Sequence, residues 1–237
     1  MPLFDRNAAG GDRDIVGSSD AASRALSVIA VENDFVEGVY EKLASVYDFT
    51  FGPSLHPGRI QAIQRMGIRP GDRILEVGVG TGINLALYPR DCAITGIDLS
   101  GPMLEKARER AHRKGKRDVR LLEMDAADLK FPDNVFDIVY APYVISVVPD
   151  PVHVANEMCR VCRAGGKIIF LNHFRSPNVV LSRIERLISP LTVHIGFKAD
   201  LDLPGFLAQA GLNPVSIEKV NVPRIFSLVT CIKDASA

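Results

Sequence analysis

Glu76-Val77-Gly78-Val79-Gly80-Thr81-Gly82 decides the fold, because this stretch stands where a short buried strand is expected to turn into a helix. Its glycines fall at every second position, where they let the backbone approach a ligand that a side chain would exclude. A nicotinamide-binding loop would need a glycine at Ile83, and no lysine follows to make a phosphate-binding loop. Glu76 suits a ligand with a cationic amino-acid end.

Short β-branched runs alternate with helical patterns from Arg73 onward. We expect strands at 74–77, 93–97, 119–124, 135–141 and 167–171, and helices at 82–87, 102–114 and 152–163. A helix at 203–210 and a hairpin of strands 214–220 and 225–232 follow. This rhythm predicts an α/β fold, in which helices cover both faces of a largely parallel sheet.

The chain ahead of this core has a different pattern. Residues 1–17 lack an apolar run and are expected to form a flexible tail, whereas 18–70 carry helical periodicity and are expected to form an extension or lid. His56-Pro57-Gly58 is interpreted as a break before the last helix of this extension. The core would then span 71–237, with a helical insertion at 174–202.

Composition limits the classes of function. The 237 residues carry 28 basic and 28 acidic side chains, so no overall charge attracts nucleic acid or an acidic membrane. The basic run from Lys106 to Arg120 is interpreted as a solvated helix face. Cys159 and Cys162 have C-x-x-C spacing without a second pair, so no metal site is expected.

Acidic residues end the next two strands after the glycine loop. Asp98 ends the second strand, where a carboxylate can accept both hydroxyls of a ribose. Asp125 follows Met124 at the end of the third strand, where an acid can accept the amino group of adenine beside an apolar stacking residue. Because parallel strands end at one edge of the sheet, these acids should share one crevice.

These features resemble the class I S-adenosylmethionine-dependent methyltransferases from about Gly71 to Ile232. The resemblance implies a Rossmann-like seven-stranded sheet with a reversed last strand, and S-adenosylmethionine as methyl donor with S-adenosylhomocysteine as product. It places Glu76 and the glycines at the methionine end, Asp98 at the ribose, and Asp125 with Ala126 at the adenine. The full set of candidate donor-binding residues is Tyr40, Glu76, Gly78, Gly80, Thr81, Gly82, Asp98, Leu99, Met103, Met124, Asp125, Ala126 and Ala141.

The residues ending the fourth strand bear on the methyl acceptor. Relatives that methylate base or amide nitrogens usually carry Asn or Asp followed by Pro-Pro-aromatic at this point. This chain has Tyr140-Ala141-Pro142-Tyr143, with Tyr140 in place of the polar residue. A planar nitrogen is therefore disfavoured as acceptor, and no nucleic-acid partner is expected.

The segment ahead of the core carries a second resemblance. The Tyr47-Asp48 pair, the glycine four residues beyond it and the following histidine resemble the quinone-biosynthesis C-methyltransferases. The longer form, with Phe51-Gly52 and Leu55-His56-Pro57-Gly58-Arg59, more closely resembles the bacterial phosphatidylethanolamine N-methyltransferases of the Rhodobacter type. That resemblance implies stepwise methylation of phosphatidylethanolamine and its mono- and dimethyl derivatives to phosphatidylcholine.

The insertion supplies an independent indication. Ser176-Pro177 is a favourable helix start, and apolar residues from Val180 to Leu191 then form a stripe. From 174 to 198 there are four basic residues and one acidic residue, a local charge of +3. A basic amphipathic helix favours contact with an anionic membrane surface, although a lid helix packed on the core would look similar. We expect a cytoplasmic protein associated peripherally with the inner face of the membrane, without an obligate protein partner.

Candidate roles in the reaction follow from residue type. His173, Tyr47 and Tyr143 are candidates to accept the proton of the acceptor ammonium, with water as an equal alternative. Aromatic faces at Tyr40, Tyr47 and Tyr143 would attract a methylated ammonium. Two alternatives remain open: a quinone C-methyltransferase and a non-catalytic S-adenosylmethionine-binding protein. The candidate headgroup-binding residues, with Arg175 as a phosphate clamp, are Tyr40, Asn172, Arg175, Arg183 and Arg186.

Overall fold

The computed structural model describes residues 52–115, 118–175, 201–221 and 224–234. The predicted tail, the helices expected between 18 and 50, and most of the insertion lie outside the described residues. The division of the chain at residue 70 therefore stays a prediction.

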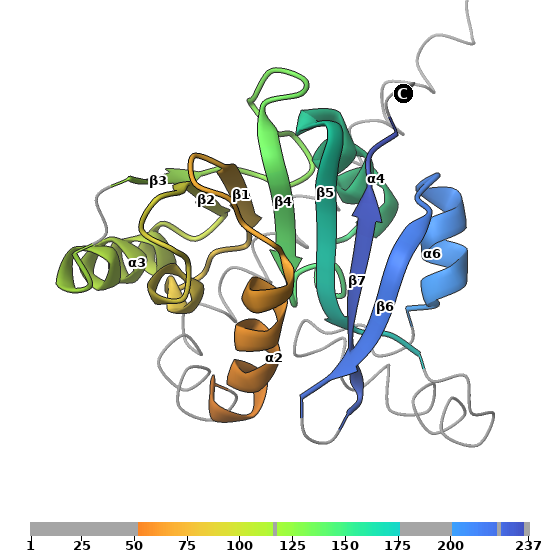
Figure 1. Ribbon diagram of the computed structural model, residues 1–237, viewed down its shortest axis with the longest axis horizontal. Coiled ribbons are helices and arrows are strands. Elements are labelled where there is room, and N and C mark those ends of the chain that lie inside the picture. Colours follow the sequence, from red (N-terminus) through yellow and green to blue (C-terminus); the bar gives the residue numbers. More distant parts are fainter. Residues whose placement is uncertain (1–51, 116–117, 176–200, 222–223, 235–237) are drawn as a thin grey trace, which may run out of the picture.

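Seven strands form one mixed sheet in the order β3-β2-β1-β4-β5-β7-β6 (Figure 1). The first five strands run parallel, whereas β7 runs antiparallel to both of its neighbours. This arrangement confirms the predicted seven-stranded sheet with its reversed last strand. The strands are β1 (Arg73–Val77), β2 (Ala93–Asp98), β3 (Val119–Glu123), β4 (Phe136–Pro142), β5 (Cys162–His173), β6 (Pro214–Val220) and β7 (Phe226–Ile232).

Helices cover both faces of the sheet and enclose two hydrophobic cores. On one face lie α2 (Gly52–Arg65), the 3-10 helix η1 (Ile83–Ala86) and α3 (Gly101–Arg113), packed against residues such as Ile74 and Ile138. On the other face lie α4 (Pro151–Val161) and α6 (Leu203–Gln209), packed against Val139 and Phe170. Strands buried on both sides explain the unbroken apolar runs in the sequence.

The helices α3, α4 and α6 begin in the same way. Each is preceded by a side chain that accepts a hydrogen bond from a backbone N–H of the first turn: Ser100 for α3, Asp150 for α4 and Asp202 for α6. A proline in the first two helical positions follows each cap, where its missing N–H costs no hydrogen bond. The cap residue and the proline together determine the residue at which each of these helices begins.

The structure corrects three sequence expectations. His56-Pro57-Gly58 does not break the chain, because α2 runs through it; Pro57 removes only its own N–H, and Gly58 allows close approach to Asn221. The helix expected at 82–87 is only the short η1 turn. The helix expected to reach residue 163 ends at Val161, because Cys162 already pairs with Phe136 at the start of β5.

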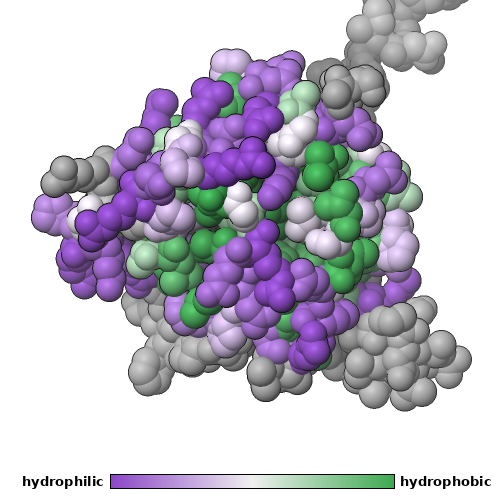
Figure 2. All heavy atoms as spheres, in the orientation of Figure 1, coloured by the Kyte–Doolittle hydropathy of each residue, from purple (hydrophilic) through white to green (hydrophobic). Residues whose placement is uncertain are grey.

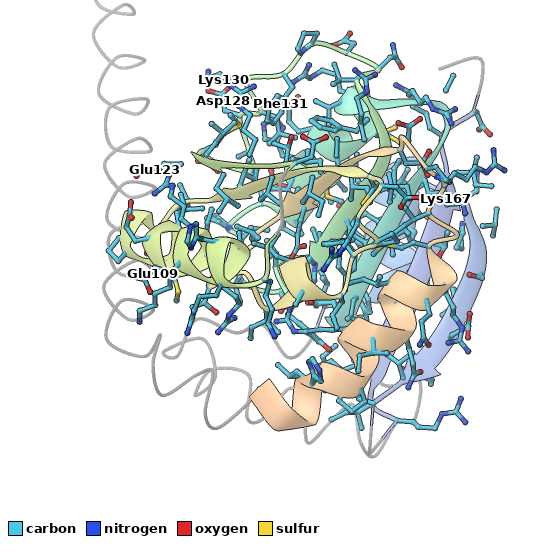
Figure 3. The ribbon with its side chains drawn as sticks, turned by 60° about the vertical axis from the view of Figure 1, so that its left-hand side comes forward. Glu109, Glu123, Asp128, Lys130, Phe131 and Lys167 are labelled. Carbon is cyan, nitrogen blue, oxygen red and sulfur yellow. The ribbon has the colours of Figure 1, made fainter. Side chains whose placement is uncertain are left out.

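Helix α2 is attached by side-chain contacts to β5 and β6 of the sheet. The Lys167 ammonium reaches from β5 and donates a 2.6 Å hydrogen bond to the Met66 carbonyl oxygen, just beyond α2 (Figure 3). An ion pair of 2.6 Å joins Arg65 of α2 to Glu218 of β6. These two contacts hold α2 and the residues directly after it against β5 and β6.

Hydrophilic side chains cover most of the face seen in Figure 2, with hydrophobic side chains between them. Among the described residues, five large hydrophobic side chains are exposed, and Leu99 is one of them. Of the described helices, none is both long and apolar enough to cross a membrane.

Candidate functional site

The predicted site lies where the strand order changes direction, between β1 and β4. In open α/β sheets, ligands bind outside the carboxyl ends of strands at such a point. The backbone there has a positive φ at all three loop glycines, Gly78, Gly80 and Gly82. A Cβ built on Gly80 would meet nothing within 4 Å, so this part of the loop faces open space. The loop therefore leaves room for a ligand beside its backbone.

Asp98 lies directly beside this loop, as the sequence predicted. Its two carboxylate oxygens accept backbone hydrogen bonds from Gly80 (2.8 Å) and Ser100 (3.0 Å). Burial raises the pKa of Asp98, and the hydrogen bonds from Ser100, Gly80 and Leu99 partly offset that rise. The carboxylate is thus held in one orientation, with lone pairs left to accept ribose hydroxyls.

The residues predicted at the adenine lie next to Asp98. The Met124 backbone N–H donates to the Asp98 carbonyl oxygen at 3.0 Å, which joins the ends of β3 and β2. The Asp125 carboxylate accepts from the Ala127 N–H at 2.8 Å, so it is oriented by its own turn. Leu99 is 41% exposed, and Met124 and Ala126 are half-buried. The predicted adenine would stack on these apolar side chains, and this role stays a prediction.

Glu76 is fully buried, and both of its carboxylate oxygens accept hydrogen bonds. Asn84 donates to one oxygen at 2.7 Å and Tyr88 to the other at 2.6 Å. Burial raises the pKa of Glu76 to about 7, although the bond from Tyr88, the positive charge of Arg59 and the bond from Asn84 lower it. A carboxylate held among neutral donors would gain from a cationic group bound nearby.

Asn84 and Tyr88 were missed by sequence reasoning. They follow Glu76 by 8 and 12 positions, and they reach it only because η1 turns the chain back over β1. The single sequence signal is that two polar side chains interrupt an apolar run. That signal does not name their partner.

Three further predicted donor-binding residues pack inside the protein. The Thr81 hydroxyl accepts a 3.1 Å hydrogen bond from Arg110 of α3. Met103 is buried in the first turn of α3, and its backbone N–H donates to the cap residue Ser100. The Ala141 side chain is buried in the core on the α4 side, so only its backbone remains for a ligand. Their assignment to donor binding stays a prediction.

Tyr143 follows β4 with a φ of 63° and joins three parts of the chain. Its hydroxyl donates to the Leu55 carbonyl oxygen at 3.0 Å and accepts from the Asn221 amide at 3.1 Å. The Arg59 guanidinium carbon lies 4.9 Å from the centre of its ring, within the range of cation–π attraction. The proton of the Tyr143 hydroxyl is therefore already used in a hydrogen bond to the backbone of α2.

His173 ends β5 and lies next to Phe226. Phe226 makes edge contacts with the two candidate catalytic rings that the structure describes, at 5.4 Å from Tyr143 and 6.0 Å from His173 between ring centres. The structure thus brings these two predicted residues into one aromatic row at the ends of β4 and β5. His173 is half-buried there.

Asn172 and Arg175 are engaged with other parts of the protein. The Asn172 amide accepts from the Ser146 hydroxyl at 3.2 Å and donates to the His173 carbonyl oxygen at 2.8 Å. Arg175 forms a 2.7 Å ion pair with Asp202, the cap of α6. A phosphate at Arg175 would have to share the guanidinium with Asp202. The other predicted residues, Tyr40, Tyr47, Arg183 and Arg186, lie outside the described residues.

The residues present fit S-adenosylmethionine. Open space lies over Gly80, a carboxylate lies beside it at Asp98, and a buried carboxylate lies below the loop at Glu76. These are the surroundings that a nucleoside with a cationic amino-acid end requires. Within the described ranges, no group of three His, Cys, Asp or Glu side chains is placed to hold a metal.

Comparison with known proteins gives consistent results. A family described as methyltransferase domain matches residues 75–170. The chain is 38% identical over 200 residues to a phosphatidylethanolamine N-methyltransferase of Cereibacter sphaeroides, covering 84% of this chain and 98% of that protein. It is 33% identical to a demethylmenaquinone methyltransferase of Bacillus cereus, covering 57% of this chain and 61% of that protein.

A solved structure has the same fold. Phosphoethanolamine N-methyltransferase 2 of Haemonchus contortus, in complex with phosphomonomethylethanolamine and S-adenosylhomocysteine, superimposes with a TM-score of 0.70 at 17% identity. The match covers 86% of this chain and 60% of that one. At 17% identity this similarity establishes a shared fold. It does not establish that the two proteins act on the same substrate.

Proposed function

The chain belongs to the class I S-adenosylmethionine-dependent methyltransferases, and from this we propose that it methylates the amino group of phosphatidylethanolamine. In this proposal the mono- and dimethyl derivatives are methylated in turn, so that phosphatidylcholine is the final product. The reaction takes place at a membrane surface, and the phospholipid headgroup is the partner that the acceptor site binds.

One observation carries the proposal. The Cereibacter sphaeroides relative named phosphatidylethanolamine N-methyltransferase is matched over 98% of its own length, so the similarity extends beyond the donor-binding core. The family match at 75–170 covers only the part of the chain that methyltransferases share. Similarity outside that part is what supports a common acceptor.

S-adenosylmethionine supplies an electrophilic methyl group on a positively charged sulfur. The protein's task is to hold the acceptor nitrogen in line with that methyl group and to exclude water. The acceptor ammonium must first lose a proton. Because the Tyr143 hydroxyl already donates to Leu55, His173 is the better placed of the two described candidate bases. Water and Tyr47 remain the alternatives.

The aromatic row at the ends of β4 and β5 supports a cationic acceptor. Each methylation makes the headgroup a bulkier cation, and each aromatic face attracts such a cation by roughly 0.5–2 kcal/mol. Tyr143 and Phe226 are in contact with each other there, with His173 next to Phe226. In the proposal, Arg183 and Arg186 contact the anionic membrane surface and Arg175 contacts the phosphate.

The second candidate is C-methylation of a quinone precursor. It is favoured by the similarity to the demethylmenaquinone methyltransferase of Bacillus cereus, which is 33% identical over 144 residues. That similarity covers 57% of this chain, against 84% for the phospholipid enzyme. A quinol carbon needs a base but no phosphate contact, so the two acceptors make different demands on the arginines.

The two functions are separated by one transfer experiment. The protein is incubated with methyl-labelled S-adenosylmethionine and liposomes that contain either phosphatidylethanolamine or a demethylated quinone. We expect label in monomethyl, dimethyl and trimethyl phospholipid in sequence. Label in the quinone, with none in phosphatidylethanolamine or its monomethyl derivative, would reject the phospholipid proposal.

A further inference from the structure

Two buried hydrogen-bond donors at the site have no hydrogen-bond partner in the part of the chain that the structure describes. The Tyr140 side chain, on β4, is fully buried, and its hydroxyl has no hydrogen-bond partner among the described residues. The Nε atom of Arg59, on α2, is also buried and without a partner in the same part of the chain. Unpaired buried polar groups are rare in proteins and each one costs free energy, so this pair calls for a ligand.

Both donors lie beside the methionine end of the donor site. Tyr140 is aligned with Glu76 across the β1 and β4 pair. The charge of Arg59 acts on both side chains, because it lowers the pKa of Glu76 and opposes the rise in the pKa of Tyr140. Tyr143 holds the Arg59 guanidinium from the outside by ring contact.

Glu76 does not serve as the partner of Arg59. Its two oxygens already accept from Asn84 and Tyr88, and no ion pair between Glu76 and Arg59 is formed. The charge of Arg59 therefore acts on the Glu76 carboxylate without a hydrogen bond between them. The Arg59 Nε–H still has no partner among the described residues.

We propose that Arg59 and Tyr140 form an oxyanion-binding site that holds an acidic group of a bound ligand. A guanidinium presents five N–H donors and no acceptor. Burial raises the pKa of Tyr140 well above 10, so its hydroxyl keeps its proton and also donates. A site that offers guanidinium N–H donors and a hydroxyl O–H donor matches a carboxylate or a phosphate, whose oxygens accept hydrogen bonds.

Two ligands carry an acidic group that could bind at Arg59 and Tyr140. One is the methionine carboxylate of the methyl donor, since Tyr140 is aligned with Glu76. The other is the phosphate of the acceptor, and this second source rests on the proposed function. The deep burial of Tyr140 favours the carboxylate, because a phosphodiester that carries two acyl chains approaches from the membrane.

The test compares matched variants in the full chain. Arg59→Gln removes the charge, Tyr140→Phe removes only the hydroxyl, and Arg65→Gln is the control. Arg65 lies on the same helix, but its partner is Glu218 at the surface. Calorimetry measures the affinity of each variant for S-adenosylhomocysteine, for its decarboxylated analogue and for glycerophosphoethanolamine.

The expected result is that Arg59→Gln weakens S-adenosylhomocysteine binding by roughly 10- to 100-fold, as loss of a hydrogen bond between charged groups does. Tyr140→Phe should weaken it less, Arg65→Gln should leave it unchanged, and the decarboxylated analogue should bind Arg59→Gln and the original chain alike. Loss confined to glycerophosphoethanolamine would support the site with phosphate as its ligand.

The proposal is overturned if Arg59→Gln and Arg65→Gln have the same affinity for each of the three ligands. Should Arg59→Gln fail to fold, Tyr140→Phe decides alone, since it keeps the ring in the core; unchanged affinities there would also overturn the site. The carboxylate result is independent of the acceptor. A chain that needs Arg59 for S-adenosylhomocysteine but methylates no phospholipid would refute only the proposed function.

Discussion

The Tyr143 hydroxyl donates a hydrogen bond of 3.0 Å to the carbonyl oxygen of Leu55, 88 positions earlier in the chain. The same hydroxyl accepts from the Asn221 amide, 78 positions later. Helix α2, the end of β4 and the end of β6 therefore meet at one phenol oxygen. The hydroxyl anchors α2, whereas the ring faces Arg59 and Phe226.

This arrangement predicts the effect of Tyr143→Phe. The ring is kept, so its contacts with Arg59 and Phe226 survive, but the Asn221 amide loses its acceptor. We expect the free energy of unfolding to fall by about 1–3 kcal/mol. Removal of a general base slows catalysis by roughly 100-fold or more, and we expect a much smaller loss of kcat here. Urea denaturation and initial-rate assays measure the two effects.

Tyr143→Ala is the matched comparison, because it removes the ring as well. It should lower activity strongly if the aromatic face binds the acceptor cation. A kcat for Tyr143→Phe as low as that of Tyr143→Ala would instead assign the hydroxyl a direct part in proton transfer.

Gly58→Ala is predicted to destabilise the protein, although alanine normally favours a helix by about 1 kcal/mol over glycine. A Cβ at position 58 would lie 2.3 Å from the Asn221 side-chain oxygen, closer than real contacts allow. Asn221 is buried and has a φ of 67°, so it has little freedom to withdraw. We expect a loss of about 1–3 kcal/mol of unfolding free energy in urea denaturation.

The double variant Gly58→Ala with Asn221→Gly tests the cause. Glycine tolerates the positive φ and removes the clashing amide, so Gly58→Ala should cost little in that background. Equal losses from Gly58→Ala with and without Asn221 would show that the contact is not the reason.

Much of the fold is predictable from the sequence because its signals are local. The strand limits of β6 and the start of α3 follow from β-branched runs and from a cap with proline behind it. Asp98 and the glycine loop are predictable for a similar reason. Each stands at a strand end, and a parallel sheet brings those ends to one edge.

The residues that sequence reasoning missed depend on contacts across the chain. Tyr88 is turned onto Glu76 by η1, and Asn221 meets Gly58 through the packing of α2 on the sheet. Pro57 and Gly58 looked like a break because the residue that packs against Gly58, Asn221, lies more than 160 positions later in the chain. Arg175 looked free as a phosphate ligand, but tertiary structure places Asp202 beside it.

Asp98→Ala is predicted to weaken S-adenosylmethionine binding. The variant lacks the carboxylate that is predicted to bind the ribose, and the Gly80 and Ser100 N–H groups lose their acceptor. We expect the dissociation constant to rise by roughly 100-fold or more in calorimetry, as for the loss of two charge-assisted hydrogen bonds. Asp91→Ala is the control, since Asp91 is exposed near the opposite end of β2. An unchanged constant for Asp98→Ala would mean that the crevice is misassigned.

Arg183→Glu combined with Arg186→Glu is predicted to reduce co-sedimentation with anionic liposomes, because each basic side chain near such a surface contributes about 1 kcal/mol. Affinity for S-adenosylmethionine should be unchanged. Arg113→Glu combined with Lys114→Glu is the control, because it changes the net charge by the same amount at exposed positions at the end of α3. Equal sedimentation of both double variants would remove the basis for a membrane-binding role of the insertion.

Glu76 is predicted to make stability depend on pH. Its pKa is about 7 in the folded protein, against a reference value of 4.5. Below pH 4.5 the group is protonated in both states. Between pH 4.5 and 7 the unfolded chain gives up this proton while the folded protein keeps it, so the unfolded state is favoured as pH rises. The full difference corresponds to about 3 kcal/mol, and it is complete above pH 7.

Glu76→Gln removes this ionisation and keeps a side chain of the same shape, which can still bond to Asn84 and Tyr88. Its unfolding free energy relative to the original protein should therefore rise by about 3 kcal/mol between pH 4.5 and 8, measured by urea denaturation without ligand. Glu109→Gln, at an exposed position on α3, should show no such trend (Figure 3). If the Glu76→Gln difference is the same at pH 4.5 and pH 8, the buried carboxylate ionises as easily in the folded protein as in water. The neutral donors around it would then suffice to hold its charge, and a cationic ligand would gain little from its position.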